Sequence, residues 1–391
     1  MKLRDLALIV LLSLLIVIGL DWMTNSLDLQ KNSWDFFYYI PMAKDGFQAR
    51  PMVSPFAYRF ATTLLVHALT WFGVSIENGF RAVAYLGAVA QLTGIFFFVV
   101  WLTGSRKGAF IALGVTALSL YNVKFLLFDM YRPDHLAYAL ILLQTWLAFQ
   151  KKFPVLLLVS VIAIQVREFN AVPLIAYIFM RWRDENQAGV KKEAAQAVIA
   201  LGLAIGLPRL LIPVTENYQI VGLSAEGIRN ALLLPFMPSV DVNFLFVIAA
   251  YFLPLLFLAD WKTIHATFQT LPRTQQRYLM AYALLVLFLT VLGGTDFARF
   301  ATFLFLPQII LIGLIAPQAS NLQNALMFIS MFIFNLIWMP FPDWNVEQYR
   351  DFYGGFSLRL NRSTFERIVE CLGFIALGAL VRKWQKSQIQ A

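Results

Sequence analysis

The sequence predicts an all-α polytopic membrane protein with about twelve transmembrane helices and no soluble domain. Of its 391 residues, 60% are hydrophobic and only 14% are charged. In soluble domains roughly 45–50% of the residues are hydrophobic and about 25% are charged. The mean hydropathy is +0.68. The apolar residues form long runs instead of alternating with polar ones, which is typical of membrane helices. A span needs ~20 residues, so we expect residues 1–391 to form a single transmembrane domain.

The first predicted span covers residues 6–20, after Lys2 and Arg4, and no small-residue cleavage motif follows it. An aromatic and proline-rich first outer loop, 23–78, comes next. Within it, the apolar segment 60–72 is too short to cross a bilayer, so an interfacial amphipathic helix is expected. The further spans are predicted at 79–103, 108–128, 135–150, 153–166, 169–182, 195–213, 243–259, 278–293, 300–316, 322–340 and 366–381.

The distribution of charges supports this topology. With both termini cytoplasmic and 60–72 on the outer surface, the inner segments hold sixteen basic and five acidic residues. If 60–72 crossed the membrane, fourteen of those basic residues would face outward, against the positive-inside rule. The net charge of +9 is therefore explained by basic cytoplasmic loops. The expected partners are membrane lipids, and no nucleic acid is expected to bind. A bacterial inner membrane is the expected location.

Several charged residues are predicted at the outer face of the membrane, in short turns between apolar runs. Charges so close to the hydrocarbon core are energetically unfavourable. Ionisable groups at this depth usually mark functional sites. For each turn alone, a local ion pair or interfacial snorkelling is an alternative reading. The outer acids and arginines lie at Asp35, in the turn 129–135 (DMYRPDH), at Arg167 and Glu168, and at Asp296 and Arg299.

These residue types suit one kind of chemistry. A carboxylate can take a proton from an attacking hydroxyl, and arginine forks hold phosphate oxygens in a fixed geometry. A polyprenyl-phosphate-linked sugar presents its phosphate at this depth. The pattern therefore predicts an extracytoplasmic site that uses such a donor.

The order of these motifs resembles a known superfamily. The first outer loop reads NSWDFFYYIPMAKDGF, and Tyr58-Arg59 then leads into the amphipathic segment. Later come Arg132-Pro133-Asp134, Arg167-Glu168, and Asp296-x-x-Arg299 before Pro307. By order and spacing, over roughly residues 1–310, the chain resembles the C-type integral membrane glycosyltransferases, which include protein O-mannosyltransferases and lipid A aminoarabinose transferases.

The resemblance implies that Asp35 is the catalytic base of an inverting glycosyltransferase. It also implies two helices along the membrane, at about 33–46 and 56–72, and a polyprenyl-phosphate-sugar donor. Some members bind a divalent metal, Mg or Mn. Asp35 has no acidic neighbour, so the metal stays open.

The remaining candidates are assigned by residue type. An alternative role for Asp35 itself is a helix cap. The outer loops 214–242 and 341–365 are long enough to cover a cavity. Donor-phosphate ligands are expected at Arg59, Arg132, Arg167 and Arg299, supporting acids at Asp134, Glu168 and Asp296, and acceptor or sugar contacts at Tyr38, Tyr39, His135, Trp344 and Tyr353.

A multi-span transporter or a lipid or sugar flippase is the rival interpretation. Such proteins often carry internal repeats and polar or broken helices near the membrane midplane. No convincing repeat relates 1–195 to 196–391, and the candidate residues lie at the outer rim. The sequence therefore favours a glycosyltransferase with a lipid or glycan acceptor.

Overall fold

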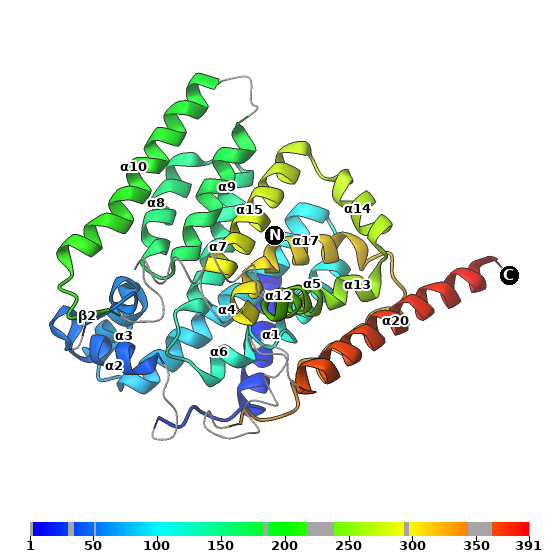
Figure 1. Cartoon of the computed structure of the whole chain (residues 1–391), viewed down its shortest axis with the longest axis horizontal. Coiled ribbons are helices and arrows are strands. Elements are labelled where there is room, and N and C mark those ends of the chain that lie inside the picture. The colour runs from blue at the N-terminus through cyan, green and yellow to red at the C-terminus, as the bar shows by residue number, and fades with distance from the viewer. Residues whose placement is uncertain are drawn as a thin grey trace.

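The computed structural model describes residues 3–29, 35–50, 52–182, 187–217, 238–292, 297–342 and 362–390. Within these ranges the fold is all-α, apart from one pair of two-residue strands, β1 (Val53–Ser54) and β2 (Glu216–Asn217). Figure 1 shows helices from distant parts of the sequence packed side by side. The predicted all-α class is confirmed.

Three helices in the described part are long and apolar enough to cross a membrane: α1 (Leu3–Trp22), α4 (Ile76–Thr103) and α10 (Gln187–Leu211). Every other predicted span also coincides with a helix, although many of these are short or interrupted. The twelve-span topology therefore stays a prediction. These helices are α5 (Arg106–Ala117), α7 (Asp134–Phe149), α8 (Phe153–Ile164), α9 (Val172–Arg181), α12 (Pro238–Tyr251), α13 (Leu253–Leu258), α15 (Arg273–Leu292), α17 (Phe305–Ile315), α18 (Asn321–Phe334) and α20 (Arg362–Gln390).

Shorter elements connect them. Helices also lie where two interfacial helices were expected. The short elements are α2 (Phe36–Asp45), η1 (Gly46–Gln48), η2 (Phe56–Tyr58), α3 (Phe60–Thr70), α6 (Lys124–Phe128), η3 (Glu168–Ala171), α14 (Trp261–Thr270), α16 (Phe297–Ala301) and η5 (Thr302–Leu304).

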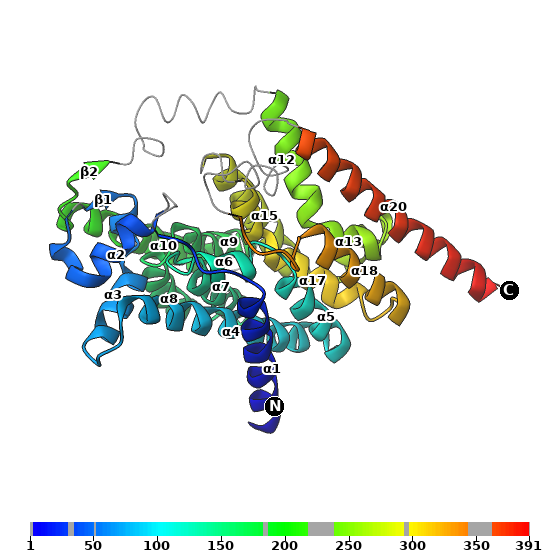
Figure 2. The ribbon, with the colours of Figure 1, turned by 90° about the horizontal axis from the view of Figure 1, so that it is seen from below.

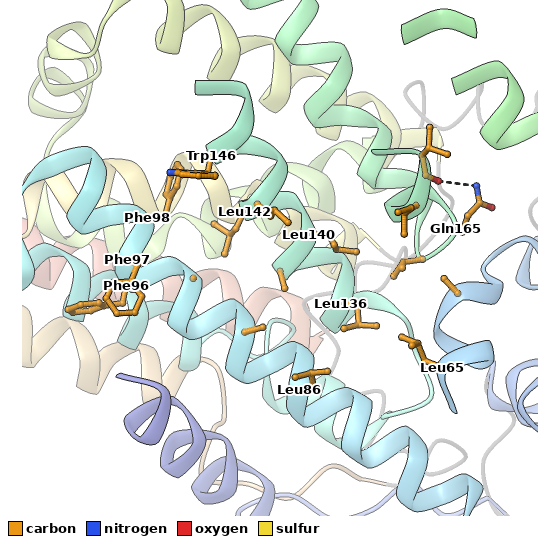
Figure 3. A pocket seen from close by; sticks show the side chains of 18 of the residues that line it. Leu65, Leu86, Phe96, Phe97, Phe98, Leu136, Leu140, Leu142, Trp146 and Gln165 are labelled. Carbon is orange, nitrogen blue, oxygen red and sulfur yellow. Dashed lines mark hydrogen bonds between the residues drawn. The ribbon is translucent and has the colours of Figure 1, made fainter. Parts of the chain in front are cut away.

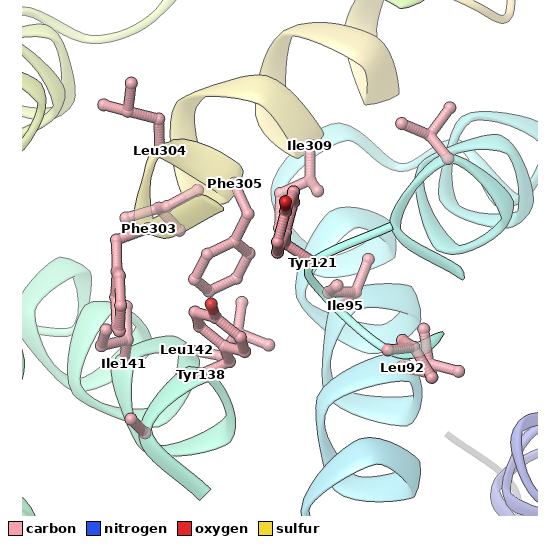
Figure 4. Close-up of a cluster of buried hydrophobic side chains, with 14 of the residues drawn as sticks. Leu92, Ile95, Tyr121, Tyr138, Ile141, Leu142, Phe303, Leu304, Phe305 and Ile309 are labelled. Carbon is pink, nitrogen blue, oxygen red and sulfur yellow. The ribbon is translucent and has the colours of Figure 1, made fainter. Parts of the chain in front are cut away.

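Helix α4 lies at the centre of the packing, against α1, α3, α5, α7 and α17. Glycines let the backbones approach, as in many membrane proteins. A Cβ atom on Gly87 would lie 2.6 Å from the Cβ of His135, and one on Gly108 would lie 2.2 Å from the carbonyl oxygen of Gly313. Figure 4 shows the apolar cluster that α4, α7 and α17 build, with Ile95 and Tyr138 among its members. This packing fixes the start of α7, and therefore the turn before it.

The segment predicted as the first outer loop is held to a distant segment. Strand β1 pairs in parallel with β2, just after α10. The backbone N–H of Thr215 donates to the carbonyl of Met52 at 2.8 Å. Figures 1 and 2 show α2, α3 and the strands gathered at one end of the molecule, while α20 runs along the opposite edge.

A buried lysine holds the segment after α18. Lys124 in α6 is fully buried, and its ammonium donates to the carbonyls of Ile337, at 2.5 Å, and Met339. These carbonyls lie beyond Phe334, the last residue of α18, and a buried carbonyl needs a hydrogen-bond donor, which Lys124 supplies. Asn25 holds the same segment, since its side chain exchanges two hydrogen bonds with the backbone of Phe341.

We expect Lys124→Met to lower the free energy of unfolding by about 1–3 kcal/mol, because it leaves buried carbonyls without donors. The measurement is thermal unfolding of the purified protein in detergent. Lys107→Met is the matched control: Lys107 also donates to backbone carbonyls between two helices, at 2.9 Å for Ala319, but it is exposed. If both substitutions lowered the unfolding temperature equally, the larger stabilisation expected from the buried Lys124 would be contradicted.

Candidate functional site

The charged residues of the predicted outer turns pair between turns. Arg132 Nη1 lies 2.8 Å from Asp35 Oδ2, which joins the turn before α7 to the start of α2. Arg167 Nε lies 3.2 Å from Asp134 Oδ1. Arg59 Nε lies 2.9 Å from Glu168 Oε1. Each pair therefore links two segments that are far apart in the sequence, and the turns form one network.

Arg132 bridges two carboxylates. Its Nη1 reaches Asp35, and its Nε donates to Asp129 at the other end of the same short turn. Asp129 is completely buried, whereas the side chain of Asp35 is 20% exposed. The guanidinium carbon lies 5.6 Å from the ring centre of Phe125. Arg132 is thus fixed on several sides, and Asp35 is the carboxylate of this group that solvent reaches.

Asp134 and Arg167 form the most buried pair, with side chains 0% and 1% exposed. Asp134 is the first residue of α7, where the helix dipole favours an anion. Arg167 has an extended backbone just before η3. Within the described ranges, Arg167 Nη1 and both Asp134 oxygens lack a well-aligned hydrogen bond. Arg167 therefore has an unused donor inside the network.

Glu168, next to Arg167 in sequence, pairs with Arg59 at the start of α3. Arg59 Nε contacts both carboxylate oxygens, at 2.9 and 3.1 Å, and Nη1 lies 3.5 Å from the hydroxyl of Tyr39. Burial acts to raise the pKa of Glu168, but the charges of Arg59 and Arg167 outweigh it and hold that pKa below its usual value. Burial raises the pKa of Tyr39 to about 12. Glu168 is therefore anionic and Tyr39 neutral at physiological pH.

Arg299 joins the network through an aromatic ring. The guanidinium carbons of Arg299 and Arg167 lie 5.0 and 5.6 Å from the centre of Phe300. The turn after Arg299 is held by three tyrosines from three helices. Tyr138 bonds the hydroxyl of Thr302, while Tyr251 and Tyr282 donate to the carbonyls of Thr302 at 3.2 Å and Phe303 at 2.7 Å, respectively.

The other predicted contact residues have varied surroundings. Tyr38 is half-buried and stacks on Phe56, with ring centres 4.5 Å apart. His135 is 2% exposed and packs where Gly87 leaves room. Asp296, Trp344 and Tyr353 lie outside the described residues, as do most of the loops 214–242 and 341–365.

Sequence reasoning did not assign roles to the three tyrosines or to Asp129. The tyrosines lie in apolar runs. There, the sequence does not distinguish a tyrosine that holds a turn through its hydroxyl from one that only packs in the core. Asp129 is in the same turn as Arg132, three residues before it. That spacing was the available signal for their pairing.

A divalent metal does not fit the described residues. No group of three or more His, Cys, Asp or Glu side chains is placed there to bind one. The carboxylates of Asp35, Asp129, Asp134 and Glu168 each face an arginine. These four carboxylates are thus engaged with Arg59, Arg132 and Arg167.

Comparisons with protein-family models, with curated proteins and with solved structures each find no match.

The network predicts a pH-dependent stability. Burial raises the pKa of Asp129 to about 6, although Arg132 opposes the shift. An unfolded aspartate titrates near ~3.9, so the folded state binds the proton more tightly. Its stabilising contribution is present below that unfolded value and is lost as the pH rises through about 6. We expect a higher unfolding temperature at pH 5 than at pH 7. Asp129→Asn should flatten this difference, and an unchanged profile would contradict the assignment.

Proposed function

We propose that the protein is an inverting glycosyltransferase that moves a sugar from a polyprenyl-phosphate-linked donor to an acceptor hydroxyl on the extracytoplasmic face of a membrane. One observation carries the proposal. Arg59, Arg132 and Arg167 form ion pairs with carboxylates of other segments, and a fourth arginine, Arg299, shares the Phe300 ring with Arg167. Desolvated arginines strengthen electrostatic contacts with a phosphate.

The proposed topology has twelve spans, with both termini cytoplasmic, in a bacterial inner membrane. Helices α2 and α3 lie along the periplasmic surface and bring Asp35 and Arg59 to the site. A helix coincides with each predicted span, which supports this arrangement. The acceptor is a lipid or a glycan.

In the proposed reaction, Asp35 is the general base. Its ion pair with Arg132 uses Oδ2, so Oδ1 takes the proton of the acceptor hydroxyl. The acceptor oxygen attacks the anomeric carbon, and a new carbon–oxygen bond forms with inversion. The bond from that carbon to the phosphate oxygen breaks, and polyprenyl phosphate leaves with the electron pair.

The arginines stabilise the charge on the departing phosphate. Arg167 has the unused Nη1 donor, and Arg299 shares the Phe300 ring with it. Arg59 contributes a third guanidinium after rearrangement of its contact with Glu168. Asp134 and Glu168 are positioning residues for these arginines.

The test uses the full-length protein in proteoliposomes with a radiolabelled polyprenyl-phosphate sugar. We expect release of polyprenyl phosphate and transfer of label to an added lipid or glycan acceptor. Protein-free liposomes are the control. Movement of the intact donor across the bilayer without cleavage of the sugar–phosphate bond would overturn the proposal in favour of a flippase.

A further inference from the structure

The backbone of the turn that carries Arg299 is held from within the helix bundle by a threonine. The hydroxyl of Thr302 donates to the carbonyl of Arg299. A threonine hydroxyl has one hydrogen, so the hydrogen bond between Thr302 and the hydroxyl of Tyr138 is donated by Tyr138. The two side chains are completely buried. The position of the Arg299 carbonyl therefore depends on Tyr138 through Thr302.

The same helix also holds a second arginine of the network. Asp134, the first residue of α7, pairs with Arg167 at 3.2 Å. Tyr138 lies four positions later, and residues four apart share one face of a helix. One face of α7 thus contacts Arg167 directly and the Arg299 turn through Thr302. Because both contacts come from one helix, α7 couples the positions of the two arginines.

A stack of aromatic rings joins the two arginine turns. Phe169, two positions after Arg167, stacks on Phe300 and on Phe303, with ring centres 5.4 and 4.1 Å apart. Both guanidinium groups lie near that same Phe300 ring. Phe303 also packs on the ring of Tyr138, at 4.8 Å, as Figure 4 shows. The Tyr138 ring therefore extends this stack while its hydroxyl holds the backbone, and removal of the hydroxyl alone separates the two contributions.

A different set of α7 residues lines a large apolar groove. The groove lies between α1, α3, α4, α7, α8 and α10 and has a volume of about 1990 Å³. Figure 3 shows Leu136, Leu140 and Trp146 of α7 in its wall. Tyr138 does not line it. A substitution that removes only the Tyr138 hydroxyl thus leaves the lining of the groove unchanged.

We infer that Tyr138 is a positioning residue for Arg299, and that α7 sets the placement of Arg167 and Arg299 relative to each other. This inference rests on the proposed function, since these arginines must stabilise the departing phosphate. Negative charge develops on the phosphate oxygen as its bond to the sugar breaks, and a guanidinium lowers the barrier when it is preorganised toward that oxygen. A displaced Arg299 therefore slows the chemical step more than it weakens donor binding.

The test is Tyr138→Phe, which removes the hydroxyl and keeps the ring. Tyr278→Phe is the matched control, because the buried Tyr278 also bonds a buried threonine of α7, Thr145, at 2.9 Å. Thr145 likewise donates to a backbone carbonyl, that of Ile141, at 2.8 Å. It lies seven positions beyond Tyr138, which is roughly 10 Å further along the helix.

The measurement is the initial rate of transfer from a radiolabelled polyprenyl-phosphate sugar, at a series of donor concentrations, by the full-length protein in proteoliposomes. The unfolding temperature of each variant in detergent is recorded in parallel. Both substitutions should lower the unfolding temperature by a similar amount, since each removes one buried hydrogen bond. Tyr138→Phe should also lower kcat about tenfold and leave the KM for the donor within about twofold of the wild-type value. Tyr278→Phe should leave both constants unchanged.

A double variant tests whether Tyr138 acts through Arg299. Arg299→Gln removes the guanidinium, so the addition of Tyr138→Phe to it should lower kcat no further. A second tenfold loss in that background would show that Tyr138 acts by another path and would overturn the inference. If the wild type transfers sugar and Tyr138→Phe has the same kcat as Tyr278→Phe, the inference is also overturned, but the proposed function stands.

The threonine provides a second route to the same contact. Thr302→Ser keeps the hydroxyl and should retain the wild-type kcat, whereas Thr302→Val removes it and should lower kcat about tenfold, as Tyr138→Phe does. Equal kcat values for the two Thr302 variants would contradict the connection from Tyr138 to Arg299. If the wild type transfers no sugar from the polyprenyl-phosphate donor, the proposed function and this inference are both overturned.

Discussion

Asp35→Asn is expected to reduce sugar transfer by a factor of about 10² to 10⁴, the range typical of general acid–base catalysis. The substitution keeps the size of the side chain and an oxygen for Arg132. It removes the carboxylate that accepts the proton of the acceptor hydroxyl. The measurement is the initial rate of transfer from the polyprenyl-phosphate sugar in proteoliposomes at equal protein content.

Asp45→Asn is the matched control for this substitution. Asp45 ends α2 in the same outer loop and is exposed, so its loss of charge should leave the rate unchanged. Because Asp35 also pairs with Arg132 at 2.8 Å, the unfolding temperature of the variant is recorded in parallel. A variant that is folded and transfers sugar at the wild-type rate would refute the role of Asp35 as base.

Asp134→Asn is expected to lower the free energy of unfolding by about 3–5 kcal/mol, because it leaves a buried guanidinium without its counter-ion. The Arg167 side chain is 1% exposed, so water cannot replace the carboxylate. The double variant Asp134→Leu with Arg167→Met should be less destabilised than the single one, since it removes both charges. Thermal unfolding in detergent is the measurement.

Glu77→Gln is the control for the buried pair. Glu77 lies 3.9 Å from Arg81, and both side chains are largely solvent-accessible, 61% and 42% exposed. Exposed pairs of this kind contribute only ~0–1 kcal/mol. If Asp134→Asn and Glu77→Gln shifted the unfolding temperature equally, the Asp134–Arg167 pair would have no special energetic role.

The sequence located the charged turns but did not reveal their pairing. Neighbours such as Arg167 and Glu168 suggested local ion pairs. In the structure Arg167 instead faces Asp134, while Glu168 faces Arg59. Arg132 with Asp129 is a pair within one turn, which corresponds to the local ion pair that was the alternative interpretation of that turn. Cross-turn partners depend on how the helices pack, and that packing depends on close approaches such as Gly87 against His135.

The positions of the helices were predicted more accurately than the residues at which they begin and end. Predicted span 243–259 became α12 and α13, which are separated at Phe252, two residues before Pro254. Proline favours the start of a helix over its interior. The groove could not be predicted, because Gly94 and Ala90 look the same in an apolar run whether they face lipid, a neighbouring helix or an open groove.

The cross-turn pairing also sets an order for biosynthesis. A chain is synthesised from its N-terminus, so Asp134 is made 33 positions before Arg167. The carboxylate that ends up fully buried is thus synthesised before Arg167, its only described counter-ion, has been added to the chain. We expect α7 to remain at the aqueous mouth of the insertion machinery until the turn before η3 has been translated. Segments α7 to α9 would then enter the bilayer as one unit, and the outer site would close before the second half of the chain delivers Arg299.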